Sequence, residues 1–358
     1  MNRNDLYKML QAVLLDYKET GREHQVDYKK FYLYSIITHS TAIEGSTVTE
    51  VENTLLFDQG IVSGKRTVNE INMNLDLKNA YVLSEKLAHD HTSYSIEMLK
   101  SLSAAVMKNT GPVRNTMLGT YDASKGDLRL ENVTAGGVRS YMGFQKVPMR
   151  LQAFCEQLNS KRSEIIDSTD IIKKYDLSFD AHFELVTIHP WVDGNGRMSR
   201  LVMNQLQEEM GIIPVKVTKE HKDGYIQSLV DSREEESTIP FREFMYGEHI
   251  GNLRQEIFDW WKENSDEYIE TKKETVSCAV KYANGKRGFP WLRDSFNELC
   301  KIIIPEKIND DPSVYRKMVA DCVLLQCKTK IEDDKIDFIR NEVYKLADNP
   351  GLGKSIHR

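Results

Sequence analysis

The chain has 358 residues, and its 48 Lys and Arg against 54 Asp and Glu give a formal net charge of −6. This negative balance argues against nucleic acid as a partner. Hydrophobic residues make up 40% and charged residues 28% of the chain, so wholesale disorder is excluded and a sizeable core can form. The length predicts two or three structural units.

Neither a membrane span nor a secretion signal is visible in the sequence. No stretch reaches the roughly 18 apolar residues that a span needs, and the first residues lack an apolar signal core. The five cysteines are scattered, without C-x-x-C or zinc-type spacing. We therefore expect a cytoplasmic protein with reduced thiols and no membrane partner.

Helical periodicity dominates the chain. Apolar residues recur at helical spacing from Phe31, and Gly45 predicts the end of that helix. Thr47 and Glu50 have the spacing of a capping box, so the next helix is expected to begin there. Further helices are expected at 96–107, 149–158, 171–188 and 198–210, and again beyond 251.

The region between Gly111 and Pro148 differs from the rest of the chain in amino-acid composition. It holds six glycines and short runs such as Asp127–Leu130. This composition predicts loops and a hairpin rather than a helix.

The segment His189–Arg200, which reads HPWVDGNGRMSR, is chemically the most informative. His189 stands at the end of a predicted helix and faces a loop. In that loop Asp193 supplies a short acid, and two glycines let the backbone approach a ligand. A new helix begins after the loop, so its amides and dipole point back at the loop, as they do in sites that bind phosphate.

Two arginines follow this loop on one helix face. Arg197 and Arg200 lie where the helix dipole disfavours a cation, so together they require an anionic partner. Asp193 suits Mg²⁺, which usually takes one or two carboxylates plus phosphate oxygens. His189 is the side chain of the segment whose pKa suits proton transfer at neutral pH. Each feature alone is common as a cap, a turn or a solvated face, but the combination suits a nucleoside triphosphate with a metal ion.

The segment resembles the signature of the Fic (filamentation induced by cAMP) family, H-x-F-x-[D/E]-G-N-G-R-x-x-R, with Trp191 in place of the usual Phe. Fic proteins are all-helical enzymes, and most transfer AMP from ATP to a hydroxyl of a target protein. The resemblance implies an all-α fold: a Fic-type helical core with a β-hairpin flap, plus N-terminal and C-terminal helical segments. We expect the N-terminal segment at 1–85, the catalytic core at 86–250 and a C-terminal domain at 251–358.

The resemblance also assigns a role to each residue of the signature. His189 would be the general base, and Asp193 would hold Mg²⁺ on the ATP phosphates. The other residues would bind phosphate: Gly194, Asn195 and Gly196 as an anion hole, and Arg197 and Arg200 on the β- and γ-phosphates. Such a transfer depends on positioning and charge stabilisation more than on covalent catalysis.

A second segment, Ser40-Thr-Ala-Ile-Glu44-Gly45, resembles the inhibitory motif [S/T]-x-x-x-E-[G/N] of the self-inhibited class, whose inhibitory helix, here at about 30–45, precedes the core. A glutamate late in a helix is disfavoured by the dipole unless a cation receives it. The resemblance supplies Arg200 as that cation. Glu44 would then occupy the γ-phosphate position, so ATP would bind without the geometry for transfer.

The glycine-rich region corresponds in order to the family's flap, which holds the target's backbone by strand addition. Gly111-Pro-Val-Arg114 resembles the family's G-x-x-R turn. The flap is expected at about 131–145, where the sequence departs from the usual paired prolines. Its central residues are Thr134, Gly136, Gly137 and Val138.

These assignments predict a self-inhibited protein adenylyltransferase that modifies a Ser, Thr or Tyr hydroxyl of a target protein or of itself. ATP would be the substrate, Mg²⁺ the cofactor, and an unknown target protein would bind through the flap. Two alternatives stay open: Glu44 orients a water that removes AMP from a modified protein, or the chain is a catalytically silent, partner-binding regulator. The sequence also leaves open the signal that frees Arg200 and whether the chain forms a homo-oligomer.

Overall fold

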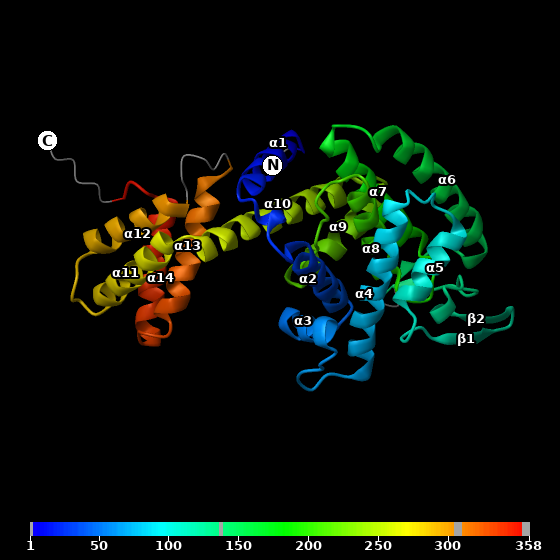
Figure 1. Ribbon diagram of the computed structural model, residues 1–358, viewed down its shortest axis with the longest axis horizontal. Helices are drawn as coiled ribbons and strands as arrows, with labels where there is room; N and C mark the ends of the chain where they lie inside the picture. The colour runs from blue at the N-terminus through cyan, green and yellow to red at the C-terminus, as the bar shows by residue number, and fades with distance from the viewer. Residues whose placement is uncertain (1–2, 136–138, 304–309, 353–358) are drawn as a thin grey trace. The chain divides into compact units, whose positions relative to one another are not determined.

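The computed structural model describes residues 3–135, 139–303 and 310–352. Fourteen α-helices and four short strands lie in these ranges, so the all-α fold with a small hairpin region is confirmed (Figure 1). The chain forms two compact units: Val26–His249 is one, and Met1–Gln25 with Ile250–Arg358 is the other. The three-part division expected from the sequence stays a prediction.

The unit Val26–His249 is built around one central helix, α8, which packs against α2, α4, α5 and α7. Leu201, Val202 and Leu206 of α8 are fully buried, as expected for a helix that neighbours cover on several sides. The helices of this unit are α2 (Tyr28–Ile43), α3 (Glu50–Gln59), α4 (Val68–His89), α5 (Ile96–Val106), α6 (Val147–Ile165), α7 (Ile171–Ile188), α8 (Asn195–Glu209) and α9 (Lys222–Glu234).

The capping box at the start of α3 differs from the predicted one. Thr49, not Thr47, is the N-cap, and it exchanges hydrogen bonds with Glu52. Glu50 instead accepts a hydrogen bond from Ser35 on α2, and Thr47 donates to Glu70. The prediction was wrong by two residues because both pairs have the same spacing, and tertiary partners decide between them.

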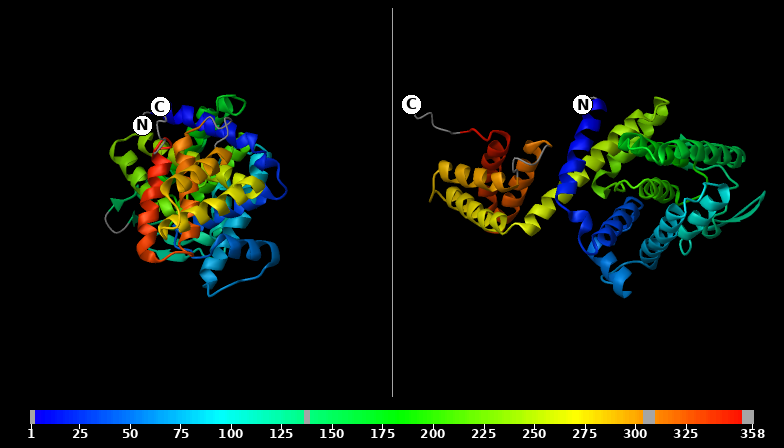
Figure 2. Two further views of the ribbon diagram at one scale, coloured as in Figure 1. Left: turned by 90° about the vertical axis from the view of Figure 1, so that its left-hand side faces the viewer. Right: turned by 45° about the horizontal axis from the view of Figure 1, so that its top comes forward.

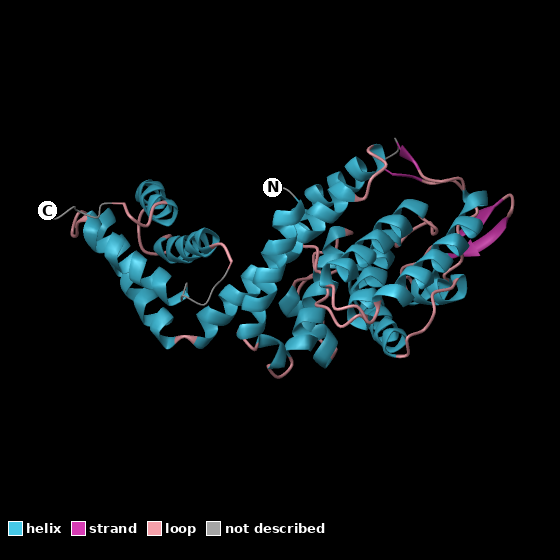
Figure 3. Cartoon of the chain, turned by 90° about the horizontal axis from the view of Figure 1, so that it is seen from above, coloured by secondary structure: helices cyan, strands magenta, loops and turns pink. Residues whose placement is uncertain are grey.

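The strands form two separate antiparallel hairpins, drawn in magenta in Figure 3. Strand β1 (Val113–Thr116) pairs with β2 (Gly119–Asp122) so that Val113 lies opposite Asp122. Strand β3 (Thr134–Ala135) pairs with β4 (Arg139–Ser140) so that Thr134 lies opposite Ser140. The β3–β4 hairpin lies within the predicted flap, whereas β1–β2 is a second hairpin that the sequence did not distinguish.

The other unit holds α1 (Arg3–Glu19) and four helices that pack together in both views of Figure 2, coloured yellow to red: α11 (Asp266–Ala283), α12 (Phe289–Ile303), α13 (Pro312–Cys327) and α14 (Asp333–Asp348). Their core includes the fully buried Phe296, Val319 and Ile339. Helix α10 (Ile239–Asn264) runs across the boundary between the units. No helix in the described ranges combines the length and apolar character that crossing a bilayer requires.

Candidate active site

His189 directly follows the last residue of α7 and has a left-handed backbone conformation, with φ of 53°. This conformation turns the chain sharply out of the helix, and its cost for a non-glycine residue is typical of functional sites. The ring nitrogen Nδ1 lies 3.3 Å from the carbonyl oxygen of Val186. Since a carbonyl only accepts, we assign the proton to Nδ1, which leaves Nε2 as the basic nitrogen.

The surroundings of His189 keep its imidazole neutral. Burial lowers the pKa of His189 to about 4, and the positive charges of Arg129 and Arg233 act in the same direction. Tyr141 stacks on the ring at a centroid distance of 3.7 Å and an interplanar angle of 14°. The neutral ring can therefore accept a proton across the physiological pH range.

The loop after His189 is held by its own side chains. Trp191 is fully buried and donates its indole N–H to the carbonyl oxygen of Gly126 at 3.1 Å. The Asn195 amide accepts from the backbone N–H of Trp191 and donates to the carbonyl of the same residue. The Asn195 side chain thus fixes the loop, and only its backbone N–H is left for an anion hole.

The N-terminus of α8 has no side-chain cap. Its N-cap is Gly194, which has a φ of 78° and provides no side chain to cap the helix. A Cβ at Gly194 would lie 2.6 Å from Sδ of Met107, and one at Gly196 would lie 2.6 Å from Oε1 of Glu44. The positive φ therefore favours glycine at 194, a side chain at 196 would press on the Glu44 carboxylate, and no side chain caps the first-turn amides of α8.

Arg197 is a buried cation with unused hydrogen-bond capacity. It is 2% exposed, and its Nε and Nη1 have no hydrogen-bond partner. Its nearest acid, Asp193, lies 3.8 Å from Nη2, and burial lowers its pKa. Buried donors of this kind are normally satisfied, so two of them beside an open helix N-terminus indicate a place for an anion.

Arg200, one turn further along α8, is fully engaged by helix α2. Its Nε donates to Oγ of Ser40 at 2.8 Å, and its Nη2 donates to the carbonyl of Ser40 at 3.0 Å and to Oε1 of Glu44 at 2.7 Å. On the other side its Nη1 donates to the hydroxyl of Tyr225 at 3.3 Å. The structure thus brings the two predicted segments together at Arg200.

Glu44 is ionised in this contact. Burial acts to raise its pKa, but the charge of Arg200 and the hydrogen bond from it outweigh burial and hold the pKa below the ordinary value. Its side chain is 32% exposed, whereas that of Arg200 is 3% exposed. Gly45, which follows Glu44, has a φ of 101° and turns the chain away from α2.

Asp193 lies at the entrance to the loop and is 59% exposed. Its carboxylate accepts a hydrogen bond from the backbone N–H of Gly194 at 2.6 Å. No group of three or more His, Cys, Asp or Glu side chains in the described ranges is arranged to hold a metal ion. A single exposed carboxylate fits an ion such as Mg²⁺ that takes most of its ligands from phosphate and water.

Arg129 joins the flap to the loop, and sequence reasoning did not identify it. It is 1% exposed and donates from Nε to the carbonyl of His189 at 2.7 Å, from Nη1 to that of Glu131 at 2.8 Å, and from Nη2 to that of Met142. One guanidinium therefore ties both ends of the flap to the backbone of His189. The sequence signal was an arginine between two leucines, Leu128 and Leu130.

The other predicted positions are placed as follows. Thr134 is exposed at the start of β3, while Gly136, Gly137 and Val138 lie outside the described residues. Arg114 of the predicted turn is exposed on β1.

Comparison with known proteins supports the signature. The profile of the Fic/DOC family matches residues 93–207. The Drosophila melanogaster protein adenylyltransferase Fic is 28% identical over 203 residues, which is 56% of this chain and 37% of that protein. The Caenorhabditis elegans protein adenylyltransferase fic-1 is 27% identical over 202 residues, again 56% of this chain and 36% of that protein.

Residues 93–207 of the chain thus match the Fic/DOC family. Solved Fic structures share the fold of the chain. Fic-1 (residues 134–508) from C. elegans has a TM-score of 0.58 at 22% identity and covers 73% of this chain and 74% of its own. A Fic domain containing signaling protein from Bacteroides thetaiotaomicron has a TM-score of 0.56 at 18% identity and covers 68% of this chain and 94% of its own. The matched region is little more than a third of the length of the curated Fic relatives.

Proposed function

We propose that this protein is a protein adenylyltransferase that is inhibited by its own helix α2. The observation that carries the proposal is the contrast between two arginines one turn apart. Arg197 is buried with two unused donor nitrogens, whereas Arg200 is occupied by Ser40 and Glu44. Self-inhibition requires such an arrangement: one arginine of the anion site is available to a ligand, and the other is occupied by a carboxylate of the chain itself.

In the reaction, Nε2 of His189 accepts the proton of a Ser, Thr or Tyr hydroxyl. The hydroxyl oxygen forms a bond to the α-phosphorus of ATP, the bond from that phosphorus to the bridging oxygen of the β-phosphate breaks, and pyrophosphate leaves. The low pKa of His189 supports this role because the ring is neutral at physiological pH. The hydrogen bond from Nδ1 to Val186 holds the ring orientation.

The phosphates would lie at the N-terminus of α8. The backbone N–H groups of Asn195 and Gly196 would face the developing negative charge, and the Nε and Nη1 donors of Arg197 would gain the acceptors that they lack. Asp193 would hold the Mg²⁺ that enters with the nucleotide and neutralises phosphate charge. Arg200 would bind the terminal phosphate once Glu44 has left it.

Glu44 prevents this last step in the inhibited state. Its carboxylate and the terminal phosphate compete for the same guanidinium, and Ser40 adds two more contacts that hold Arg200 toward α2. The target would bind along the β3–β4 hairpin by strand addition, with its hydroxyl delivered to His189 beside the ring of Tyr141.

The test is labelling of the protein by ATP that carries its label on the α-phosphate. We expect weak labelling of the wild type, strong labelling of Glu44→Gly, and none of Glu44→Gly combined with His189→Ala. Glu23→Gly, an exposed glutamate outside the site, is the matched control and should label as the wild type does. Equal labelling of wild type and Glu44→Gly would contradict the inhibition.

The reverse reaction is the competing function, because the partly exposed Glu44 carboxylate could orient a water toward an AMP-modified hydroxyl. Incubating a modified target with wild type and Glu44→Gly separates the two. Removal of AMP that requires Glu44 would favour the reverse reaction. A silent regulator would bind no ATP in calorimetry, with or without Glu44.

A further inference from the structure

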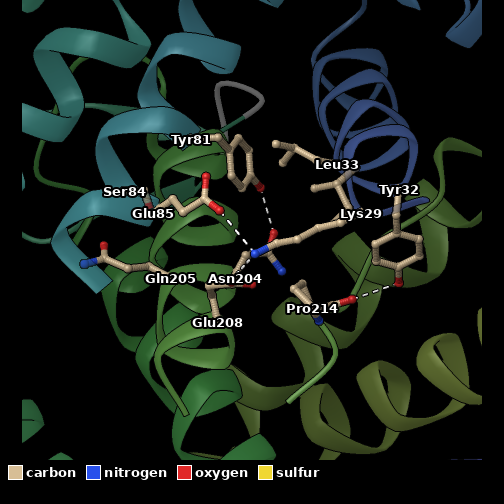
Figure 4. A pocket seen from close by; sticks show the side chains of 11 residues that line it. Lys29, Tyr32, Leu33, Tyr81, Ser84, Glu85, Asn204, Gln205, Glu208 and Pro214 are labelled. Atoms are coloured by element: carbon tan, nitrogen blue, oxygen red, sulfur yellow. Dashed lines mark hydrogen bonds and ion pairs between the residues drawn. The ribbon is translucent and has the colours of Figure 1, made fainter. Parts of the chain in front are cut away.

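A cavity of about 90 Å³ lies behind the inhibitory helix, on the face of α2 that packs toward α4 and α8 (Figure 4). Tyr32, Leu33 and Ile36 of α2 form one wall, and Tyr81 and Ser84 of α4 form another. Ser84, which is 2% exposed, contributes only a small side chain to the α4 wall. An engineered cavity of roughly 150 Å³ binds benzene, so this one suits a ligand of a few carbon atoms.

The two tyrosine hydroxyls of the cavity wall have hydrogen-bond partners. Tyr81 donates to Oδ1 of Asn204 at 2.7 Å, and Tyr32 donates to the carbonyl of Pro214 at 2.8 Å. Gln205 of α8 is 2% exposed, and its Oε1 has no hydrogen-bond partner. The surface inside the cavity is therefore mainly apolar, while Oε1 of Gln205 is buried in the protein beside it.

The mouth of the cavity carries an excess of negative charge. Nζ of Lys29 lies 3.1 Å from Glu85 and 2.5 Å from Glu208, so one cation serves two carboxylates (Figure 4). The Lys29 side chain is 70% exposed, and exposed ion pairs of this kind contribute little to stability. An ammonium group from outside would compete with Nζ of Lys29 for the two acids.

We propose that this cavity binds a small primary amine with an apolar body. The ammonium group would lie between Glu85 and Glu208, and the hydrocarbon would pack against Leu33 and Ile36. A carboxylate or phosphate ligand is disfavoured, because two acids face one lysine at the mouth of the cavity. No other site described above uses these residues.

The consequence for activity rests on the proposed function. The ligand would contact α2, which carries Ser40 and Glu44, and also α4 and α8. A ligand that binds only while α2 is docked stabilises the docked state by mass action. The amine would therefore lower labelling of the wild type and leave labelling of Glu44→Gly, which lacks the inhibitory carboxylate, unchanged.

Calorimetric titration of the full chain with isoamylamine tests the binding, and isoamyl alcohol serves as the neutral analogue of nearly the same shape. We expect saturable binding of the amine and weaker binding of the alcohol. Lys29→Met removes the competing cation and should tighten amine binding about fivefold. Glu208→Gln should weaken it by a similar factor.

Lys30→Met is the matched control, because Lys30 directly follows Lys29 on α2 but pairs with Asp27 and Asp58 instead. It should leave amine binding unchanged. Equal affinity for amine and alcohol, no effect of Lys29→Met, or no saturable binding at all would each overturn the proposal. The titration measures binding without catalysis. A failure to bind amine would therefore contradict this proposal alone, and a failure of AMP transfer would contradict the proposed function alone.

Discussion

Arg129 offers the sharpest test of how the flap controls the site. Its guanidinium donates to three backbone carbonyls, those of His189, Glu131 and Met142. Arg129→Lys keeps the charge, but one ammonium on a flexible stem cannot reach three carbonyls in this arrangement. We expect it to keep about one of the three hydrogen bonds and to release the flap from His189.

The magnitude follows from the bonds lost. A hydrogen bond from a charged group contributes about 1.5–3 kcal/mol, so losing two costs at least about 3 kcal/mol. If this free energy is lost from the conformation in which the flap is held against His189, labelling in the Glu44→Gly background slows by roughly 100-fold. Hydrogen exchange should accelerate in the flap and at His189, and much less in α8.

Arg114→Lys is the control for this experiment, because Arg114 is an exposed arginine on β1. It should leave both labelling and exchange as they are in Glu44→Gly alone. The reasoning is refuted if Arg129→Lys labels at the full rate. It is also refuted if exchange rises equally throughout the domain, since the loss would then be one of global stability.

Three further outcomes follow from the site. Ser40→Ala removes the hydroxyl that accepts from Nε of Arg200 and should raise wild-type labelling by about tenfold, which is less than Glu44→Gly does. Tyr225→Phe leaves the buried Nε2 of His182 without its partner, so unfolding followed by calorimetry should show a loss of about 1–3 kcal/mol. The pKa of His189 is lowered to about 4, so it gains its proton only near that pH, and labelling by Glu44→Gly should fall tenfold per pH unit below about pH 4 rather than below the ordinary 6.5. A decline already centred near 6.5 would contradict the buried, neutral base.

The sequence predicted those parts of the molecule that local patterns determine. Helix α7 ends at Ile188, as its periodicity and Pro190 indicate. The pairing of Glu44 with Arg200 joins residues 156 positions apart, and it was expected because the resemblance and the helix dipole both pointed to it. The end of a helix and the residues of a motif can both be predicted from the sequence, because each depends on neighbouring residue types.

The rest depended on contacts that no local pattern specifies. The capping box moved from Thr47 to Thr49 because Glu70 and Ser35 provide competing partners from other helices. Arg129 donates to three carbonyls in separate turns, and the sequence does not show where backbone carbonyls will lie. The stacking of Tyr141 on His189 depends on how the flap folds over the loop.

The most direct test of the central claim is a crystal structure of Glu44→Gly with Mg²⁺ and a non-hydrolysable ATP analogue. We predict that the phosphates lie against the first-turn amides of α8, that Arg197 uses its two free nitrogens on them, and that Arg200 binds the terminal phosphate. We also predict that Nε2 of His189 faces the α-phosphate from the side of the flap. An analogue bound elsewhere, with Arg197 still unpaired, would contradict the account.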